Sequence, residues 1–192
     1  MVIILGFANL IADGFSMSVG AFLSSKSEKE RFQKEKSREY WEIEHMRESE
    51  VEEVQTIFSE LGFKDEMLDK VVQKITENDD RWVDIMMKHE LEMIEEKKSS
   101  FAIGLTTFIS FFVFGFIPLL VYLLDYSIAE IDQKFLISAC LTALVFIVIG
   151  WLKSVVTKTS HIRGIVETLA LGLIAAILAY AAGDLLKHWL MG

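Results

Sequence analysis

The sequence predicts an all-α protein, a polytopic membrane helical bundle of four spans with an inserted cytoplasmic acidic domain of three to four helices. Two observations predict this fold. The 192-residue chain is 52% hydrophobic, yet 24% of its residues are charged and its net charge is −9. The charges are concentrated, because 22 of the 28 acidic and 14 of the 19 basic residues lie within residues 24–100. One charged block in a nearly charge-free chain is typical of a membrane protein.

Four apolar stretches are about as long as the roughly 20 residues that a helix needs to cross a bilayer. They must be helical, because lipid offers the backbone no hydrogen-bond partners. The stretches are residues 2–23, 101–124, 135–152 and 165–186. We therefore expect a first span over residues 1–23, a polar domain over 24–100 and three further spans over 101–192.

The distribution of lysine and arginine predicts the orientation. These residues flank both ends of the polar domain and occupy the connection 153–163, whereas the connection 125–134 has one lysine. The positive-inside rule places the polar domain and the connection 153–163 in the cytoplasm. Both termini are then on the other side.

The polar domain should be helical throughout. Residues 26–47 contain no glycine or proline, so the first span should continue as a long helix. Ser49 followed by Glu52 is a capping-box pattern for a second helix, which Gly62 should end. Residues 65–76 have apolar side chains at helical spacing, and a fourth helix should start at a cap on Asp79 and run to residue 98.

Small residues in the second and fourth spans indicate close helix packing, within the chain or between chains. A proline in the second span is expected to kink it. These positions are Gly104, Gly115, Gly172, Ala176, Ala179, Gly183 and Pro118.

Composition argues against several functional classes. Cys140 is the only cysteine, so no disulfide can form within one chain, and a small buried apolar residue is expected there. A negative balance with no Lys/Arg stripe argues against nucleic acid as a partner. The sequence has no nucleophile elbow, phosphate loop or zinc motif. We expect neither an enzyme nor an organic cofactor.

The first span carries polar side chains on one face. Asn9, Asp13 and Met17 follow one another at intervals of four residues. A carboxylate within a span is costly to bury in lipid and usually faces a bundle interior or an ion path. A methionine thioether can contact a transition metal. Asp13 is thus a candidate for an ion path, and a structural hydrogen bond is the alternative.

The polar domain carries pairs of carboxylates at helical spacing, which can bind a common cation. Added thioethers favour a borderline metal such as Fe²⁺ or Mn²⁺. A solvated acidic face is the alternative for these residues, which are Glu39, Glu42, Glu50, Glu53, Met86, Met87 and Glu90. Glu42 and His45 also form the Glu-x-x-His unit of di-iron bundles, but the second copy that such a centre needs is absent from the sequence.

Several segments resemble the vacuolar iron transporter family. Residues 6–30, GFANLIADGFSMSVGAFLSSKSEKE, are similar to the family's second transmembrane helix, with its Ser-Met pair at Ser16 and Met17. The resemblance continues through WVDIMMKHEL at 82–91, GLTTFISFFVFGFIPLL at 104–120, the short basic loop and the last helix. It therefore covers essentially the whole chain in the order of the family.

This resemblance implies a function. Family members have five spans and a cytoplasmic metal-binding domain, and they move cytosolic Fe²⁺ or Mn²⁺ out of the cytoplasm in exchange for protons, usually as homodimers. The implied membrane is a prokaryotic cell membrane or that of a vacuole-like organelle. The resemblance implies that the seven Glu and Met residues above bind metal, and that Asp13 and Met17, with Asn9, line the translocation path.

Two departures from the family pattern bear on this expectation. Asn9 stands where the family usually has an intramembrane glutamate, and Asp13 lies one turn further on. The family's first span, with its translocation-path aspartate, has no counterpart, so we expect an N-terminal piece to be missing. The alternative function is a membrane-tethered metal-binding or sensing module without transport.

Overall fold

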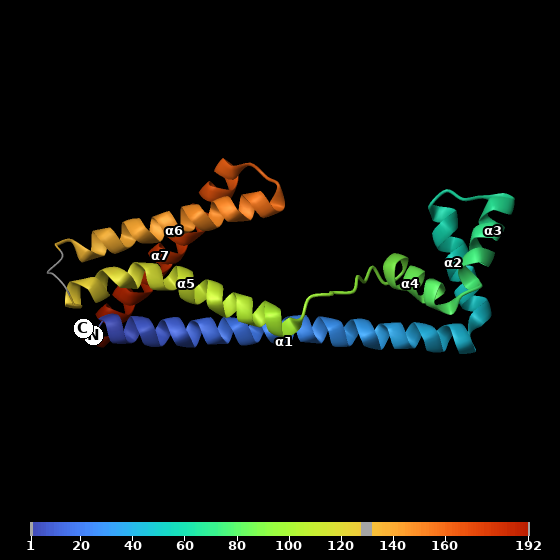
Figure 1. Ribbon diagram of the computed structural model, residues 1–192, viewed down its shortest axis with the longest axis horizontal. Helices are drawn as coiled ribbons and strands as arrows, with labels where there is room; N and C mark the ends of the chain where they lie inside the picture. The colour runs from blue at the N-terminus through green and yellow to red at the C-terminus, as the bar shows by residue number, and fades with distance from the viewer. Residues whose placement is uncertain (1, 128–131, 192) are drawn as a thin grey trace. The chain divides into compact units, whose positions relative to one another are not determined.

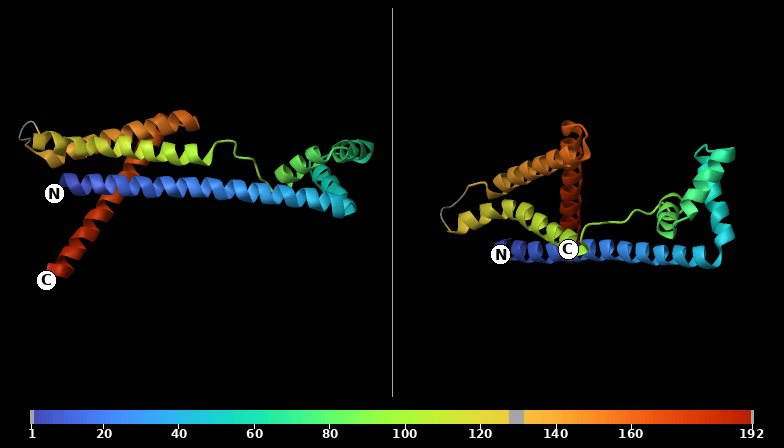
Figure 2. Two further views of the ribbon diagram at one scale, coloured as in Figure 1. Left: turned by 60° about the horizontal axis from the view of Figure 1, so that its bottom comes forward. Right: turned by 45° about the vertical axis from the view of Figure 1, so that its right-hand side comes forward.

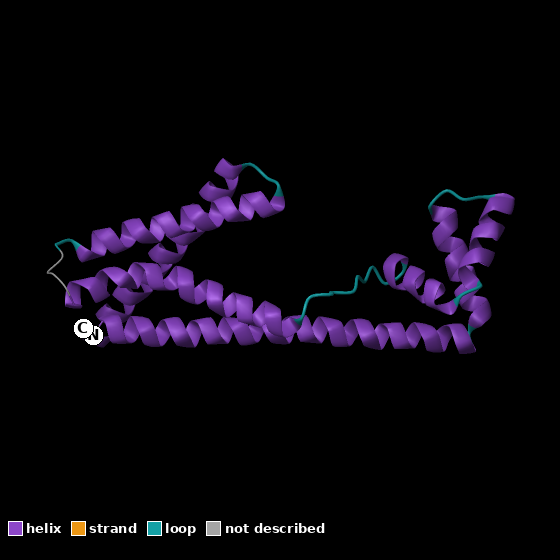
Figure 3. Ribbon diagram, in the orientation of Figure 1, coloured by secondary structure: helices purple, strands orange, loops and turns teal. Residues whose placement is uncertain are grey.

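The computed structural model describes residues 2–127 and 132–191, and all regular secondary structure within these ranges is helical (Figures 1 and 3). This confirms the all-α class. The helices are α1 (Val2–His45), α2 (Arg47–Glu60), α3 (Asp65–Thr76), α4 (Asp79–His89), α5 (Ser100–Ser127), α6 (Lys134–Thr157) and α7 (His161–Met191).

Four of these helices, α1, α5, α6 and α7, are long and apolar enough to cross a membrane. Each contains one of the four predicted spans. Helix α1 also continues to His45 without a break, as the absence of glycine and proline predicts. Pro118 lies inside α5.

The chain divides into two compact units. The first consists of residues 1–16 and 108–192 within the described ranges, and the second of residues 17–107. The predicted polar domain, residues 24–100, lies wholly within the second unit.

Glycines bring the helices of the first unit together. The Cβ of a side chain at Gly115 would lie 2.5 Å from Leu10 Cδ1, and one at Gly14 would lie 3.0 Å from the Phe111 ring. Helices α6 and α7, joined by residues 158–160 (orange to red in Figure 2), pack through Gly150 and Gly164. At their junction the buried Ser154 hydroxyl contacts the Trp151 carbonyl and His161 Nδ1, each at 2.6 Å.

The small-residue positions divide into two groups. Gly104 lies against Ser18, and Gly172 lies against the Phe146 ring, as the packing interpretation predicts. Among the residues that the structure describes, nothing lies within 4 Å of a Cβ built at Gly183. Ala176 and Ala179 are exposed, so the second half of α7 does not use its small residues for packing within this chain.

We expect Gly150→Ala to destabilise the protein. A Cβ at Gly150 would lie 2.7 Å from Ile165 Cα and 2.8 Å from the Gly164 carbonyl oxygen, so the backbone of α7 would have to move. Overpacking of this kind costs about 1–3 kcal/mol. Gly183→Ala is the matched control and should leave the melting temperature unchanged or slightly raised, because alanine favours helix. Thermal unfolding in detergent measures both, and equal melting temperatures would contradict the packing argument.

The second unit has its own hydrophobic core. The core-facing side chains recur at helical spacing, for example Ile43 on α1 and Val54 on α2. Its buried members are Phe32, Ile43, Val54, Leu68, Val72, Ile75, Trp82, Val83, Met86 and Met87. This core joins the charged end of α1 to α2, α3 and α4.

The boundaries of α3 and the end of α2 are confirmed, and Gly62 follows α2 with a positive φ of 97°. Two predicted helix starts are wrong. Helix α2 begins at Arg47, so Ser49 lies inside it and does not cap it. Helix α4 is capped by Asn78, whose side chain accepts a hydrogen bond from Arg81 N at 2.9 Å, and Asp79 is its first residue.

The predicted extension of α4 to residue 98 is also wrong, because the helix ends at His89. The following Glu/Lys-rich segment favours helix by propensity, but Leu91 and Met93 pack against the core of the second unit. Glu92 adopts a positive φ of 51°, which is incompatible with a continued helix. Tertiary packing therefore overrides propensity here.

Candidate metal centre

Two of the predicted metal ligands lie inside the core of the second unit. Glu39 is 2% exposed and Glu50 is 4% exposed. Each lies one turn before a core residue of its own helix, Glu39 before Ile43 and Glu50 before Val54. The hydrophobic pattern of α1 and α2 therefore turns these two carboxylates inward, and the solvated-face alternative fails for both.

The two buried carboxylates lack full hydrogen bonding. Oε2 of Glu39 and Oε2 of Glu50 are buried without a hydrogen-bond partner in the described structure. Burial raises the pKa of both carboxyls from the ordinary 4.5 to about 7. Such a pair is poised to exchange a proton for a cation near neutral pH.

Part of this rise in pKa comes from neighbouring glutamates. Glu90, Glu50, Glu42 and Glu53, in decreasing order, act on Glu39 after burial itself. Glu90 is exposed at the end of α4, and its pKa is raised by partial desolvation and then by Glu53 and Glu42. All five predicted carboxylates thus lie close enough to influence one another, although they come from α1, α2 and the end of α4.

The predicted thioethers belong to the same core. Met86 is 0% exposed and Met87 is 2% exposed, and both are part of the cluster that contains Ile43 and Val54. Glu90, the C-cap residue of α4, lies one turn beyond Met86. Carboxylate oxygens with soft sulfur nearby suit a borderline ion such as Fe²⁺ or Mn²⁺.

The carboxylates are near one another without forming a coordination shell. Within the described ranges, no group of three His, Cys, Asp or Glu side chains is placed to hold one metal ion. Like charges repel, and Glu42 instead accepts a hydrogen bond from Arg38 Nε at 2.9 Å. Metal binding would therefore require side-chain movement.

His45 contacts Trp41 of its own helix. Its ring stacks on Trp41 at 4.5 Å between centroids, and Nδ1 lies 2.8 Å from the Trp41 carbonyl oxygen. The Glu-x-x-His unit of Glu42 and His45 thus has one ring nitrogen held by its own helix. This contact leaves Nε2 open to a ligand, so a di-iron centre is disfavoured only by the missing second copy of the unit in the sequence.

The three residues of the first span that were predicted to line an ion path are exposed. Asn9 and Asp13 are open, and Met17 is 54% exposed. The packed face of α1 is instead formed by Leu10 and Gly14, which lie against α5. The side chains that were predicted to line an ion path therefore point away from the helix packing of the chain.

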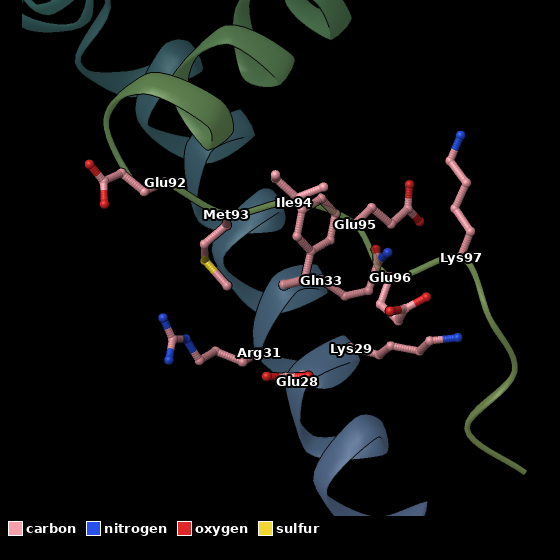
Figure 4. Close-up of a pocket in the computed structure, with 11 residues that line it drawn as sticks. Glu28, Lys29, Arg31, Gln33, Glu92, Met93, Ile94, Glu95, Glu96 and Lys97 are labelled. Carbon is pink, nitrogen blue, oxygen red and sulfur yellow. The ribbon is translucent and has the colours of Figure 1, made fainter. Parts of the chain in front are cut away.

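A pocket elsewhere in the second unit does not coincide with the predicted ligands. It lies between the charged part of α1 and residues 92–97, with Arg31 and Lys29 on one side and Met93 and Glu96 on the other (Figure 4). None of the seven predicted ligands lines it. Acidic and basic side chains both line this pocket, so it does not favour a ligand of either charge.

Sequence reasoning did not single out Trp82, which is 0% exposed at the centre of the core. Its indole nitrogen is buried without a hydrogen-bond partner among the described residues. Its spacing in the sequence could have indicated its position, because Trp82 precedes the predicted ligand Met86 by one helical turn and so lies on the same face of α4.

Comparison with known proteins identifies the family. The sequence model of the VIT family matches residues 1–184 of this chain. The chain belongs to this family. Vacuolar iron transporter 1 of Arabidopsis thaliana is 30% identical over 189 residues, which cover 98% of this chain and 74% of that protein. Vacuolar iron transporter of Plasmodium falciparum is 30% identical over 194 residues, covering 97% of this chain and 71% of the relative.

Vacuolar iron transporter 1 of Tulipa gesneriana is 28% identical over 182 residues, covering 94% of this chain and 72% of that protein. The resemblance found in the sequence is thus confirmed over nearly its whole length. These relatives are named as transporters and not as enzymes, in agreement with the predicted class. Together with the four apolar helices of this chain, they identify an integral membrane protein.

Proposed function

We propose that this VIT family member is a transporter of Fe²⁺ or Mn²⁺ that moves the ion out of the cytoplasm in exchange for protons. The observation that carries the proposal is the pair of buried, incompletely bonded carboxylates, Glu39 and Glu50, in a core that also holds Met86 and Met87. Burying two carboxylates in one small core is unfavourable unless a cation or proton compensates their charge.

The polar domain, residues 24–100, would capture the ion at the cytoplasmic face through its glutamates. Metal binding replaces the protons that Glu39 and Glu50 hold near neutral pH, since both pKa values are about 7. The cytoplasmic orientation is supported by the lysines and arginines that flank this domain and follow α6. Iron is favoured by the names of the relatives, and manganese remains a chemically equivalent cargo for this donor set.

Transfer across the membrane would use Asp13, Met17 and Asn9 on α1. All three are exposed in the single chain, and an intramembrane carboxylate facing lipid is costly. A second copy of the chain would cover this face, so we place the path at a homodimer interface. The vacuolar names of the relatives favour an organelle membrane as the setting.

Metal uptake into proteoliposomes tests this function. We expect Fe²⁺ or Mn²⁺ added outside to enter vesicles whose lumen is acidic, with protons leaving as the metal enters.

A cysteine label reports the orientation of the protein in these vesicles. Because Ser59 on α2 is exposed, Ser59→Cys in a Cys140→Ser background can be labelled with an impermeant maleimide where it faces outward. Uptake should scale with the fraction of molecules that present Ser59 outward. Metal binding without uptake or proton release would contradict transport and favour the tethered binding module.

A further inference from the structure

We propose that Trp82 is a positioning residue of the metal centre, whose indole N–H donates a hydrogen bond to a carboxylate of the buried Glu39 and Glu50 pair when metal is bound. This inference rests on the proposed metal capture by these glutamates. It assigns a role to a side chain that is not itself a ligand. Indole nitrogen is a donor only, so Trp82 can orient a carboxylate without competing for the ion.

The first line of evidence is a match between unsatisfied groups. Among the described residues, the buried side-chain N and O atoms without a hydrogen-bond partner are Glu39 Oε2, Glu50 Oε2 and Trp82 Nε1. They are two acceptors and one donor. Native proteins rarely leave such groups unpaired, and a cluster of them requires an explanation. If the side chains rearrange around a metal so that the donor meets one acceptor, both groups are satisfied.

The second line of evidence is their location in one core. Trp82 belongs to the same buried cluster as Ile43 and Val54, which lie one turn from Glu39 and Glu50 respectively. On α4, Trp82 is followed at intervals of four residues by Met86 and Glu90, so all three lie on one face. The face that presents the predicted thioether and carboxylate therefore also presents the indole.

The third line of evidence is how the indole ring is held. The Arg47 guanidinium carbon lies 4.8 Å from the Trp82 ring centroid, and Arg47 also donates to the Thr76 carbonyl at 2.9 Å. Arg47 is one turn before Glu50 on α2. The cation thus covers one face of the ring and links the indole to the first turn of α2, the helix that carries Glu50.

A donor at this place would have a defined effect on metal binding. A carboxylate that offers one oxygen to a metal has a second oxygen that must be satisfied. Hydrogen bonds to that oxygen fix the orientation of the ligand, and removing such an outer partner typically lowers metal affinity by about 10- to 100-fold. Trp82 would also tie the ligands of α1 and α2 to α4, which carries Met86 and Glu90.

The test uses the full chain in detergent with Mn²⁺ as the probe. Trp82 is replaced by β-(3-benzothienyl)alanine, which keeps the ring shape and substitutes sulfur for the N–H, and in parallel by phenylalanine. We expect the isosteric replacement to lower Mn²⁺ affinity by about tenfold or more in calorimetry. The metal-free melting temperature should stay the same or rise, because an unsatisfied donor is removed. Trp41→Phe, at an exposed position, should leave the affinity unchanged.

A purely structural role for Trp82 predicts the opposite pattern. The metal-free melting temperature would then fall, while the folded protein would bind Mn²⁺ as tightly as the wild type. That result with the benzothienyl variant would overturn the positioning role and leave metal capture intact. Absence of Mn²⁺ and Fe²⁺ binding by the wild type would instead overturn the proposed function, and this inference with it.

Discussion

Asp13→Asn should abolish metal uptake into proteoliposomes, with a loss of at least roughly a hundredfold in rate. Asp13 is the one carboxylate in the membrane part of α1, and of the three predicted path residues only Asp13 can alternate between a protonated and a metal-bound state. Asparagine has nearly the same size, so the packing of α1 through Leu10 and Gly14 should not change. The variant should therefore fold normally and bind metal at the acidic helices, yet transport none.

Asn9→Ala is the matched comparison, because Asn9 lies one turn away on the same exposed face. Its amide oxygen can contact a passing ion but cannot exchange a proton, so we expect a decrease of only about two- to fivefold. Uptake of radioactive or dye-reported Mn²⁺ measures both variants. If Asp13→Asn transported metal as well as the wild type, Asp13 would be a structural residue and the path would lie elsewhere.

The sequence was most informative about elements that a single physical constraint determines. The four spans followed from length and apolarity alone, because lipid permits only a helix there. The bounds of α3 followed from its amphipathic spacing, with Leu68, Val72 and Ile75 facing the core. Helix periodicity also placed Glu39 one turn from Ile43 and Glu50 one turn from Val54, which is why these two carboxylates face inward.

The errors fell where tertiary contacts compete with local preferences. The end of α4 depended on Leu91 and Met93 packing against the core, which no local pattern in that Glu/Lys-rich segment indicates. The start of α2 depended on where α1 ends, since only Met46 separates them. Trp82 was missed because an isolated tryptophan in a helix is normally a packing residue. Its importance emerges only from its unpaired nitrogen among unpaired carboxylate oxygens.

Glu39→Gln combined with Glu50→Gln should remove calorimetric Mn²⁺ or Fe²⁺ binding at moderate salt, a loss of at least about a hundredfold in affinity. A specific site depends on these two side chains, whereas diffuse attraction by an acidic domain is screened over about 8 Å at physiological ionic strength. The control is Glu95→Gln with Glu96→Gln, which removes the same number of carboxyl groups, and at least as much negative charge, from exposed positions outside the core. Equal losses in the two double variants would show that bulk charge alone attracts the metal.

The same double variant should change the pH dependence of stability, which separates loss of ligands from unfolding. In the folded protein Glu39 and Glu50 have pKa values of about 7, above the ordinary 4.5, so between these values the folded state holds protons that the unfolded state has lost. The metal-free wild type should thus lose stability as the pH rises from about 4.5 to about 7. Above pH 7 these two groups should change its stability little. Glutamine cannot ionise, so the double variant should lack this decrease and be more stable than the wild type at pH 8.

The metal affinity of the wild type should rise as the pH rises from about 4.5 to about 7, because protons then compete less for the two carboxylates. A double variant that melts earlier than the wild type at pH 8 would show that these carboxylates stabilise the metal-free fold, in contradiction to a core poised for a cation.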